Sequence, residues 1–206
     1  MSSPSQPPKT PQRQIRALYD TDTITVYQAY SAAIAGPAVQ TQRLSASPLF
    51  SPTRMTWIKP SWAWMMYRSG YSYKDAGQER VLALRMTHEH FRRLLAQAVV
   101  CRGQRLSEEE RGMGVRVQWD PERGPGMEVL PYRSIQVGIS GEVGRGWVEE
   151  GIVGIEDVTE RARRLREVVG REGGVGLGEL VERGLVPRER VYDVPEELRE
   201  RLLMDE

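Results

Sequence analysis

The segment RMTWIKPSWAWMMYRSG, residues 54–70, contains the residue types in this chain that best suit ligand chemistry. Three of the five tryptophans lie within it, interleaved with cationic side chains. Guanidinium groups hold phosphate oxygens through paired hydrogen bonds, and aromatic faces stack on flat rings. A packed junction between a strand and a helix explains any single tryptophan equally well. The combination with Arg54, Lys59 and Arg68, and with the ring of Tyr67, favours a site for an anionic, planar ligand such as a nucleotide.

Lys59, Pro60 and Ser61 suggest a second way of holding an anion. Proline suits the first turn of a helix, where its missing N–H costs nothing. If a helix begins at Pro60, its free N–H groups and positive dipole end lie beside the Lys59 amine and the Ser61 hydroxyl. The alternative is that these residues only begin a helix.

Arg16 and Tyr19 precede this block on a short expected strand. Their odd spacing points them to opposite sides of a regular strand, so one is expected to face the site and the other the sheet edge. Gln28, expected on the next helix, is placed to approach a ligand.

Sequence signatures of common enzyme classes are absent. There is no P-loop, no G-x-G-x-x-G, no C-x-x-C and no G-x-S-x-G. His88 and His90 are two apart on an expected helix and point about 200° apart, so surface histidines are favoured and no metal is expected. Glu149, close to Trp147, is a candidate general base or part of a solvated helix face.

Length and composition restrict the class of protein. A chain of 206 residues suffices for one core, and its net charge of +1 gives no overall attraction to nucleic acid or membranes. A single cysteine excludes an intrachain disulfide. No apolar run reaches the roughly 18 residues of a membrane span, and the N-terminal segment has no apolar signal-peptide region. We therefore expect no membrane association and a cytoplasmic or nucleocytoplasmic protein.

Hydrophobic patterns predict an α+β protein with a small central mixed or antiparallel sheet flanked by helices. Strands are expected within QIRALY (residues 14–19) and at 54–58, 81–86, 115–119 and 133–139. Helices are expected at 24–35, 60–69, 88–98, 159–169 and 194–206, with a helical turn at 147–150. The first helix should stop at Gly36-Pro37, and Asp193 should cap the last. On the helix at 60–69, Trp62, Met65, Met66 and Ser69 share one face. Loops are expected at 107–112, 120–126 and 171–179.

These elements predict three parts of the chain. Residues 1–12 form a tail rich in Pro, Ser and Gln, expected to be disordered. Residues 13–169 form one α+β domain. Residues 170–206 are expected to form a glycine-rich linker and an amphipathic helix.

Four blocks together resemble the domain-of-unknown-function family 4291. They are residues 16–30, residues 54–70, the pair Gln78-Glu79, and RSIQVGI at 133–139. The resemblance covers about residues 15–159, and the central block is highly specific. It implies a domain type and no activity.

At the level of the fold, this family is similar to ADP-ribosyltransferases. That similarity implies NAD as co-substrate, with Arg16 gripping it and Trp57 or Tyr67 stacking on nicotinamide. Gln136 would lie on the last core strand. The sequence departs from the Gln-x-Glu pattern, because Gly138 stands where glutamate is expected, so Glu149 would have to substitute from a loop.

Three functions follow from these features. The first is a nucleotide-binding enzyme, concretely an NAD-dependent ADP-ribosyltransferase-like transferase with a protein or RNA acceptor, in which Gln136 or Glu149 orients a ribose hydroxyl. The second is a nucleic-acid-binding or RNA-processing module using the same aromatics and arginines. The third is a non-enzymatic interaction protein.

Overall fold

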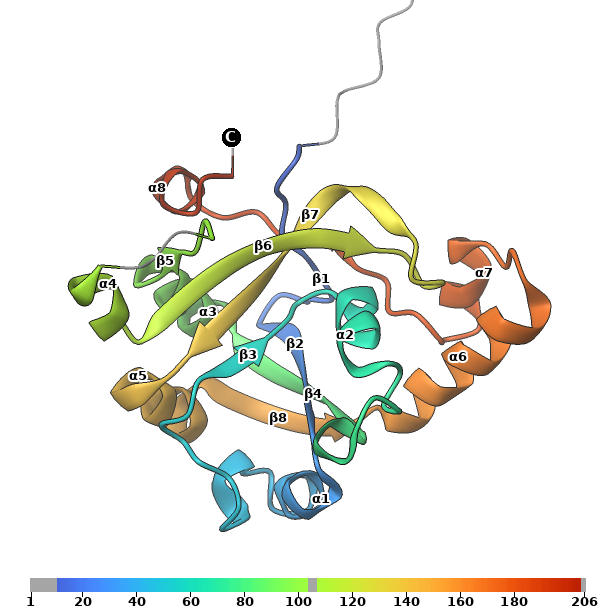
Figure 1. Ribbon diagram of the computed structural model, residues 1–206, viewed down its shortest axis with the longest axis horizontal. Helices are drawn as coiled ribbons and strands as arrows, with labels where there is room; N and C mark the ends of the chain where they lie inside the picture. Colours follow the sequence, from blue (N-terminus) through green and yellow to red (C-terminus); the bar gives the residue numbers. More distant parts are fainter. Residues whose placement is uncertain (1–10, 104–106, 205–206) are drawn as a thin grey trace, which may run out of the picture.

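The computed structural model describes residues 11–103 and 107–204 and shows an α+β protein, as the sequence predicts (Figure 1). The expected tail falls mainly on residues 1–10, outside the described part. Within the described residues the strands form three sheets. The first is antiparallel, in the order β2 (Thr23–Tyr30), β4 (Arg80–Thr87) and β8 (Ile152–Asp157). The second has the order β3 (Thr56–Ile58), β7 (Val129–Ile139), β6 (Val115–Arg123) and β5 (Val99–Val100), with β5 and β6 parallel and the other pairs antiparallel. The third pairs β1 (Arg16–Ala17) with β9 (Arg190–Val191).

Helices surround these sheets. They are α1 (Ala32–Thr41), α2 (Trp62–Ser69), α3 (His88–Ala96), α4 (Glu108–Gly112), α5 (Gly141–Gly146), α6 (Thr159–Glu172), α7 (Leu177–Glu182) and α8 (Glu196–Arg201). The short turns η1 (Leu44–Ala46), η2 (Ala76–Gln78) and the π-helical η3 (Trp147–Gly151) complete the described elements.

The two larger sheets meet at one pair of residues. The Tyr27 N–H donates to the Lys59 carbonyl at 2.7 Å, and the Lys59 N–H donates back at 3.0 Å. Beyond this bridge β2 continues along β4, whereas β3 continues along β7. Figure 1 shows β6 and β7 on one side of the molecule and β8 on the other, with β2 and β3 between them. The sheets therefore separate on leaving the bridge.

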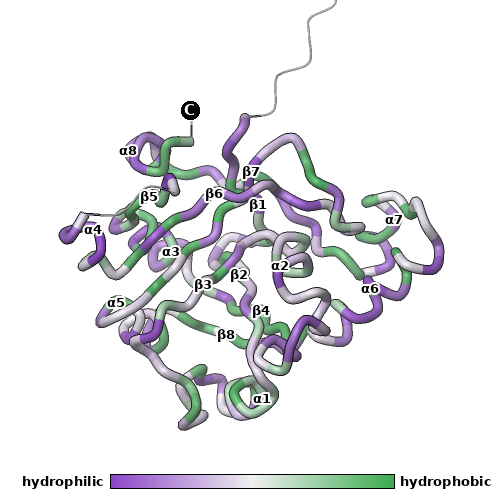
Figure 2. The backbone as a smooth tube through the Cα atoms, viewed as in Figure 1, coloured by the Kyte–Doolittle hydropathy of each residue, from purple (hydrophilic) through white to green (hydrophobic). Residues whose placement is uncertain are grey.

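Alternation along the strands produces two hydrophobic clusters. One face of each large sheet contributes side chains such as Val26, Leu84 and Val137 to the main core. The opposite face of β2 and β4 packs against α2, α6 and α7. As predicted, the shared helical face of α2 is buried: Trp62, Met65, Met66 and Ser69. The arginine-rich α6 is mostly hydrophilic along its length (Figure 2).

The helix predicted at 24–35 is wrong. Residues 23–30 form β2, and the helix that follows begins at Ala32 and continues through Gly36 and Pro37 to Thr41. Four consecutive β-branched residues open this segment, and they fit a half-buried pleated surface better than a helix. The apolar spacing misled because β2 is buried on both faces: Ile24 belongs to the main cluster and Tyr27 to the second one.

Several smaller expectations also need correction. Residues 107–112, expected as a loop, contain α4 with a capping box between Ser107 and Glu110. Part of 120–126 continues β6, part of 171–179 belongs to α7, and β8 was not expected. His90, expected at the surface, is buried. No Asp193 side-chain cap is present on α8, which follows Pro195.

Residues after Val169 pack against the rest of the chain. Tyr192, Val194 and Leu202 belong to the main hydrophobic cluster. The Trp119 indole N–H donates to the Leu202 carbonyl at 2.9 Å, and the Tyr19 hydroxyl donates to the Val191 carbonyl at 2.8 Å. The C-terminal segment is therefore held at both β9 and α8.

Candidate functional site

A cavity of about 750 Å³ lies where the two large sheets separate. Its lining comes from the end of β2, the segment 49–57, Lys59, α2, the loop before β4, and the strands β6 and β7. Five of the residues singled out from the sequence line it: Arg54, Trp57, Lys59, Arg68 and Gln136. Gln28 lines it as well, from β2 and not from the expected helix.

One face of the second sheet forms the polar wall of this cavity. Gln118 on β6 lies directly opposite Gln136 on β7, and Trp57 on β3 lies opposite Gly138. Because successive strand residues point to opposite faces, these side chains alternate with buried neighbours such as Val117. The alternation that builds the core thus also presents amides and an indole to the cavity.

Asp120 fixes the orientation of both glutamines. Its Oδ2 accepts from Gln136 Nε2 at 2.6 Å, and its Oδ1 accepts from Gln118 Nε2 at 3.2 Å. An ionised carboxylate only accepts, so both amides turn their NH₂ groups toward it and their carbonyl oxygens away from it. Burial raises the pKa of Asp120, while the hydrogen bond from Gln136 and the charge of Lys59 lower it.

Trp57 explains why residue 138 is glycine. A Cβ built at Gly138 would lie 3.0 Å from two indole carbons of Trp57 and 2.8 Å from Met55 Sδ. A glutamate at this position would require the indole to move. The packing of Trp57 and Met55 therefore leaves no room for a side chain at position 138.

Lys59 is the most unusual side chain of the cavity. Only 2% of it is exposed, and its Nζ donates to the Trp57 carbonyl at 2.7 Å. Burial, together with the positive charge of Arg68, lowers the pKa of this amine from 10.5 to about 7, although the charge of Asp120 acts in the opposite direction. The sequence predicted that this amine would hold an anion beside a helix start, whereas in the structure it is buried and donates to a carbonyl oxygen.

Arg54 and Arg68 supply positive charge at the exposed part of the lining. Arg68 Nη1 donates to Gln78 Oε1 at 3.2 Å, which joins α2 to the loop before β4. Both guanidinium groups belong to residues that line the cavity, so an anion there would meet two arginines.

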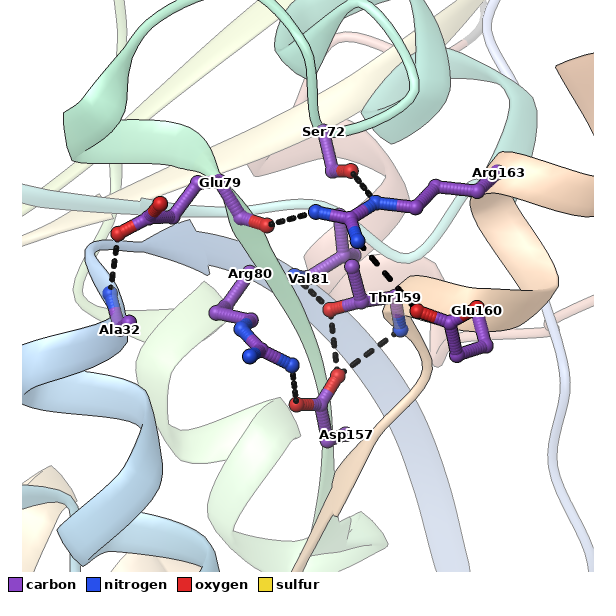
Figure 3. Close-up of polar contacts among 9 residues, drawn as sticks. All are labelled: Ala32, Ser72, Glu79, Arg80, Val81, Asp157, Thr159, Glu160 and Arg163. Carbon is purple, nitrogen blue, oxygen red and sulfur yellow. Dashed lines mark hydrogen bonds and ion pairs between the residues drawn. The ribbon is translucent and has the colours of Figure 1, made fainter.

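A polar cluster holds the loop that carries Gln78 (Figure 3). Glu79 Oε1 accepts from the Ala32 N–H at the start of α1, at 2.8 Å. Arg163 on α6 donates to Ser72 Oγ at 3.0 Å and to the Glu79 carbonyl at 3.4 Å. These contacts tie the loop to α1 and α6, and so fix one wall of the cavity.

The same cluster anchors the start of α6 (Figure 3). The Thr159 hydroxyl accepts from the Val81 N–H at 3.0 Å and donates to Asp157, whose carboxylate also accepts from the Thr159 N–H at 2.9 Å. Arg80 pairs with Asp157 at 3.3 Å.

The other residues selected from the sequence do not line the cavity. Ser61 is the N-cap of α2: its Oγ accepts from the Trp64 N–H at 3.1 Å and donates to Glu122 Oε1 at 2.9 Å. The helix thus begins after Ser61 and not at Pro60. Glu149 is exposed on η3.

Arg16, Tyr19 and Tyr67 make contacts elsewhere. Arg16 donates to Gln14 and lies 5.9 Å from the ring of Tyr132. Tyr19 contacts the β9 region through its hydroxyl, as described above. Tyr67 stacks on Trp64 with ring centroids 5.1 Å apart.

Sequence reasoning missed Gln118, Asp120, Glu122 and Glu189. Glu189 Oε1 accepts from the Trp62 N–H at 2.6 Å, and burial raises its pKa well above the usual value. A signal existed for Gln118, which lies at a polar position of the strand expected at 115–119. Asp120 fell in the loop expected at 120–126, whereas it continues β6. Nothing in the local sequence joins Glu189 to a helix start more than 120 residues away.

A family model described as a domain of unknown function (DUF4291) matches residues 14–192. The chain belongs to this family. The match extends past residue 159, where the sequence resemblance was expected to end, and it includes β9 and every residue that lines the cavity. No curated protein matches the chain. In the pair Gln78-Glu79, one of the sequence blocks that resemble this family, Gln78 accepts a hydrogen bond from Arg68 and Glu79 accepts one from the N–H at the start of α1.

Two further findings concern the described residues alone. Within 11–103 and 107–204, no helix has the length and apolar character needed to cross a membrane. In the same part of the chain, no group of three or more His, Cys, Asp or Glu side chains converges to hold a metal ion.

Proposed function

We propose that the cavity binds a nucleotide and that the protein is an NAD-dependent transferase similar to ADP-ribosyltransferases. The observation that carries this proposal is the convergence of Arg54, Arg68, Trp57 and Gln136 in one cavity of about 750 Å³. These residues come from the segment before β3, from β3, from α2 and from β7. Ligand sites of this size usually combine apolar walls with a few fixed polar groups.

Each part of a nucleotide has a suitable partner in the lining. Arg54 and Arg68 suit phosphate oxygens through paired hydrogen bonds. Trp57 offers an aromatic surface for a planar ring, and Phe50 and Tyr30 lie further along the wall with ring centroids 6.0 Å apart. The carbonyl oxygens of Gln118 and Gln136 suit ribose hydroxyls.

The transfer itself makes modest demands on the protein. Departure of nicotinamide leaves positive charge on the ribose, and an acceptor then attacks the anomeric carbon. Positioning and electrostatic support suffice for such a step. In this proposal Gln136 orients a ribose hydroxyl, held by Asp120, and Glu149 has no part because it lies outside the cavity.

Calorimetry with NAD, ADP-ribose and ATP tests nucleotide binding directly. Arg68→Gln is expected to weaken ADP-ribose binding roughly tenfold or more, because a charged hydrogen bond contributes about 1.5–3 kcal/mol. The control is Arg164→Gln on the exposed surface of α6, expected to bind as the wild type does. Incubation with labelled NAD and candidate protein or RNA acceptors then tests transfer. A folded protein that binds none of the three nucleotides below millimolar concentration contradicts the proposal.

The surface near the cavity favours a second candidate, binding of single-stranded nucleic acid. Tyr67 is 42% exposed with Arg123 at 4.0 Å from its ring centroid, and Tyr73 is 53% exposed with Arg166 at 4.6 Å. Exposed rings stack on bases and arginines contact phosphates. A steep loss of RNA affinity with salt supports this candidate, whereas a pocket for a small nucleotide predicts a shallow one.

A further inference from the structure

The nucleotide proposal leaves the Lys59 amine without a role. The side chain lines the cavity, is 2% exposed, and has one hydrogen-bond acceptor among the described residues, the Trp57 carbonyl. A charged ammonium has three donors to satisfy. Burying it with a single acceptor and with Arg68 nearby disfavours the charged form, which Asp120 only partly offsets, so this environment raises the neutral fraction of the amine.

A neutral lysine amine in a cavity is a nucleophile. Desolvation and a neighbouring cation are the two ways by which proteins activate lysine for attack on a carbonyl carbon, and Lys59 has both. With a pKa of about 7, about half of the amine is neutral at pH 7. An ordinary lysine has a pKa of about 10.4, so its neutral fraction at that pH is roughly a thousandfold smaller.

The remaining lining indicates which carbonyl compound would fit. Arg54 and Arg68 suit a phosphate, and the carbonyl oxygens of Gln118 and Gln136 suit hydroxyl groups. A phosphorylated sugar in its open-chain form has a phosphate, several hydroxyls and an aldehyde.

We propose that Lys59 Nζ condenses with the aldehyde of a phosphorylated sugar bound in this cavity. The nitrogen lone pair attacks the carbonyl carbon, and a C–N bond forms. The carbonyl oxygen then leaves with the two amine hydrogens as one molecule of water, which gives a C=N bond. The step involves no oxidant or reductant, and it goes beyond the nucleotide proposal because it does not require NAD.

Borohydride trapping tests the proposal on the wild-type protein. The full-length chain is incubated with ribose 5-phosphate at pH 7, reduced, digested and analysed by mass spectrometry. A reduced adduct adds the mass of the sugar less one oxygen atom. The chain has three lysines, Lys9, Lys59 and Lys74, so the position is unambiguous. Chymotrypsin is preferred for the digest, because trypsin cleaves poorly before Pro60.

The expected result is an adduct at Lys59 at least roughly tenfold more abundant than at Lys74, given the gain in neutral fraction. Lys59→Arg should abolish it, and Lys74→Arg should leave it unchanged. Arg68→Gln should lower trapping of ribose 5-phosphate more than that of ribose. Trapping at Lys59 should already be near its maximum above pH 8. Added Nα-acetyl-lysine, whose side-chain amine is free, should still react faster with each pH unit because most of that amine remains charged.

Equal labelling of the three lysines, or labelling at Lys74 without Lys59, overturns the proposal and identifies ordinary surface glycation. This reading does not depend on whether Lys59→Arg folds, because it comes from the wild-type chain. Calorimetry with ADP-ribose separates the two proposals. Trapping at Lys59 without nucleotide binding supports the proposal of imine formation and contradicts the transferase proposal. Nucleotide binding without trapping at Lys59 contradicts imine formation and supports the nucleotide site.

Discussion

Single buried side chains account for the pH dependence and the packing tolerance that we expect of this cavity. Lys59 is charged at pH 7 in an unfolded chain but close to half neutral in the folded one. Gly138 lies under the Trp57 indole with no room for a Cβ. Each feature predicts a measurable effect of one substitution.

Lys59→Met should remove a pH dependence of stability. The folded pKa of Lys59, about 7, is below its unfolded value of 10.5, so between these values the unfolded state binds more protons. Wild-type stability should therefore rise with pH across this window, by at most about 1.4 kcal/mol per pH unit relative to Lys59→Met. Urea unfolding of both proteins at pH 7, 8 and 9 measures the difference. Parallel curves would show that Lys59 is charged in the folded state.

Gly138→Ala should displace Trp57. The new Cβ requires a shift of the indole and of Met55 Sδ, so we expect a loss of about 1–3 kcal/mol of stability and a change in tryptophan fluorescence. Gly36→Ala in α1 is the control, since nothing lies within 4 Å of its Cβ. Alanine there should stabilise by about 0.5–1 kcal/mol. Equal effects of the two substitutions in urea unfolding would refute the packing argument.

At the scale of elements, the start of α2 determines where the cavity side chains of that helix point. Ser61 caps the helix, and the carboxylates of Glu122 and Glu189 accept from Ser61 Oγ and the Trp62 N–H. Three segments distant in sequence therefore meet at one helix end. Arg68, on the last turn of this helix, depends on that anchorage for its place at the cavity.

Ser61→Ala should cost more stability than the same change at an exposed cap. It removes the cap of α2 and also leaves buried Glu122 without its Ser61 donor, so we expect a loss of about 2–3 kcal/mol. Ser107→Ala, which removes the cap of the exposed helix α4, should cost about 1 kcal/mol. Thermal or urea unfolding compares the two. Similar losses would mean that the bond to Glu122 contributes nothing.

At the scale of the whole molecule, the C-terminal segment packs into the main hydrophobic cluster, so we expect it to unfold together with the rest of the chain. β9 pairs with β1, and Tyr192 packs among His88, Phe91 and Tyr19. The segment crosses the molecule from α7 to α8 (Figure 1). Its removal would open the main hydrophobic cluster at several points.

Adjacent residues of this segment provide a matched test. Tyr192 is buried and Val191 is 42% exposed. Tyr192→Ala should cost about 3–5 kcal/mol, as truncation of a large buried ring does. Val191→Ala should change stability by about 0.5 kcal/mol or less. Each variant should unfold in a single urea transition, and the midpoint for Tyr192→Ala should be clearly lower than that for Val191→Ala. Equal midpoints would show that the segment does not unfold together with the rest of the chain.

Local patterns determined a large part of this architecture. The alternation in VRVQW and RSIQVGI identified β6 and β7, and the spacing of Trp62, Met65, Met66 and Ser69 identified the buried face of α2. Residue types selected Arg54, Trp57, Lys59 and Arg68, and the similarity to a known fold selected Gln136; all five line one cavity. Such patterns succeed because burial of one face has a fixed period in a strand and in a helix.

Tertiary structure decided what local patterns leave open. Whether residues 23–30 form a strand depended on β4 as a partner, because a strand buried on both faces shows no alternation of apolar and polar residues. Arg16, Tyr19, Ser61, Tyr67 and Glu149 have suitable chemistry but lie outside the cavity, since the direction of a side chain depends on how its element packs. Asp120 joins two glutamines from neighbouring strands, and the pKa of Lys59 follows from burial beside Arg68. The sequence thus identified side chains with suitable chemistry. Which of them lie together, and in which protonation state, depends on burial and on contacts between segments distant in sequence.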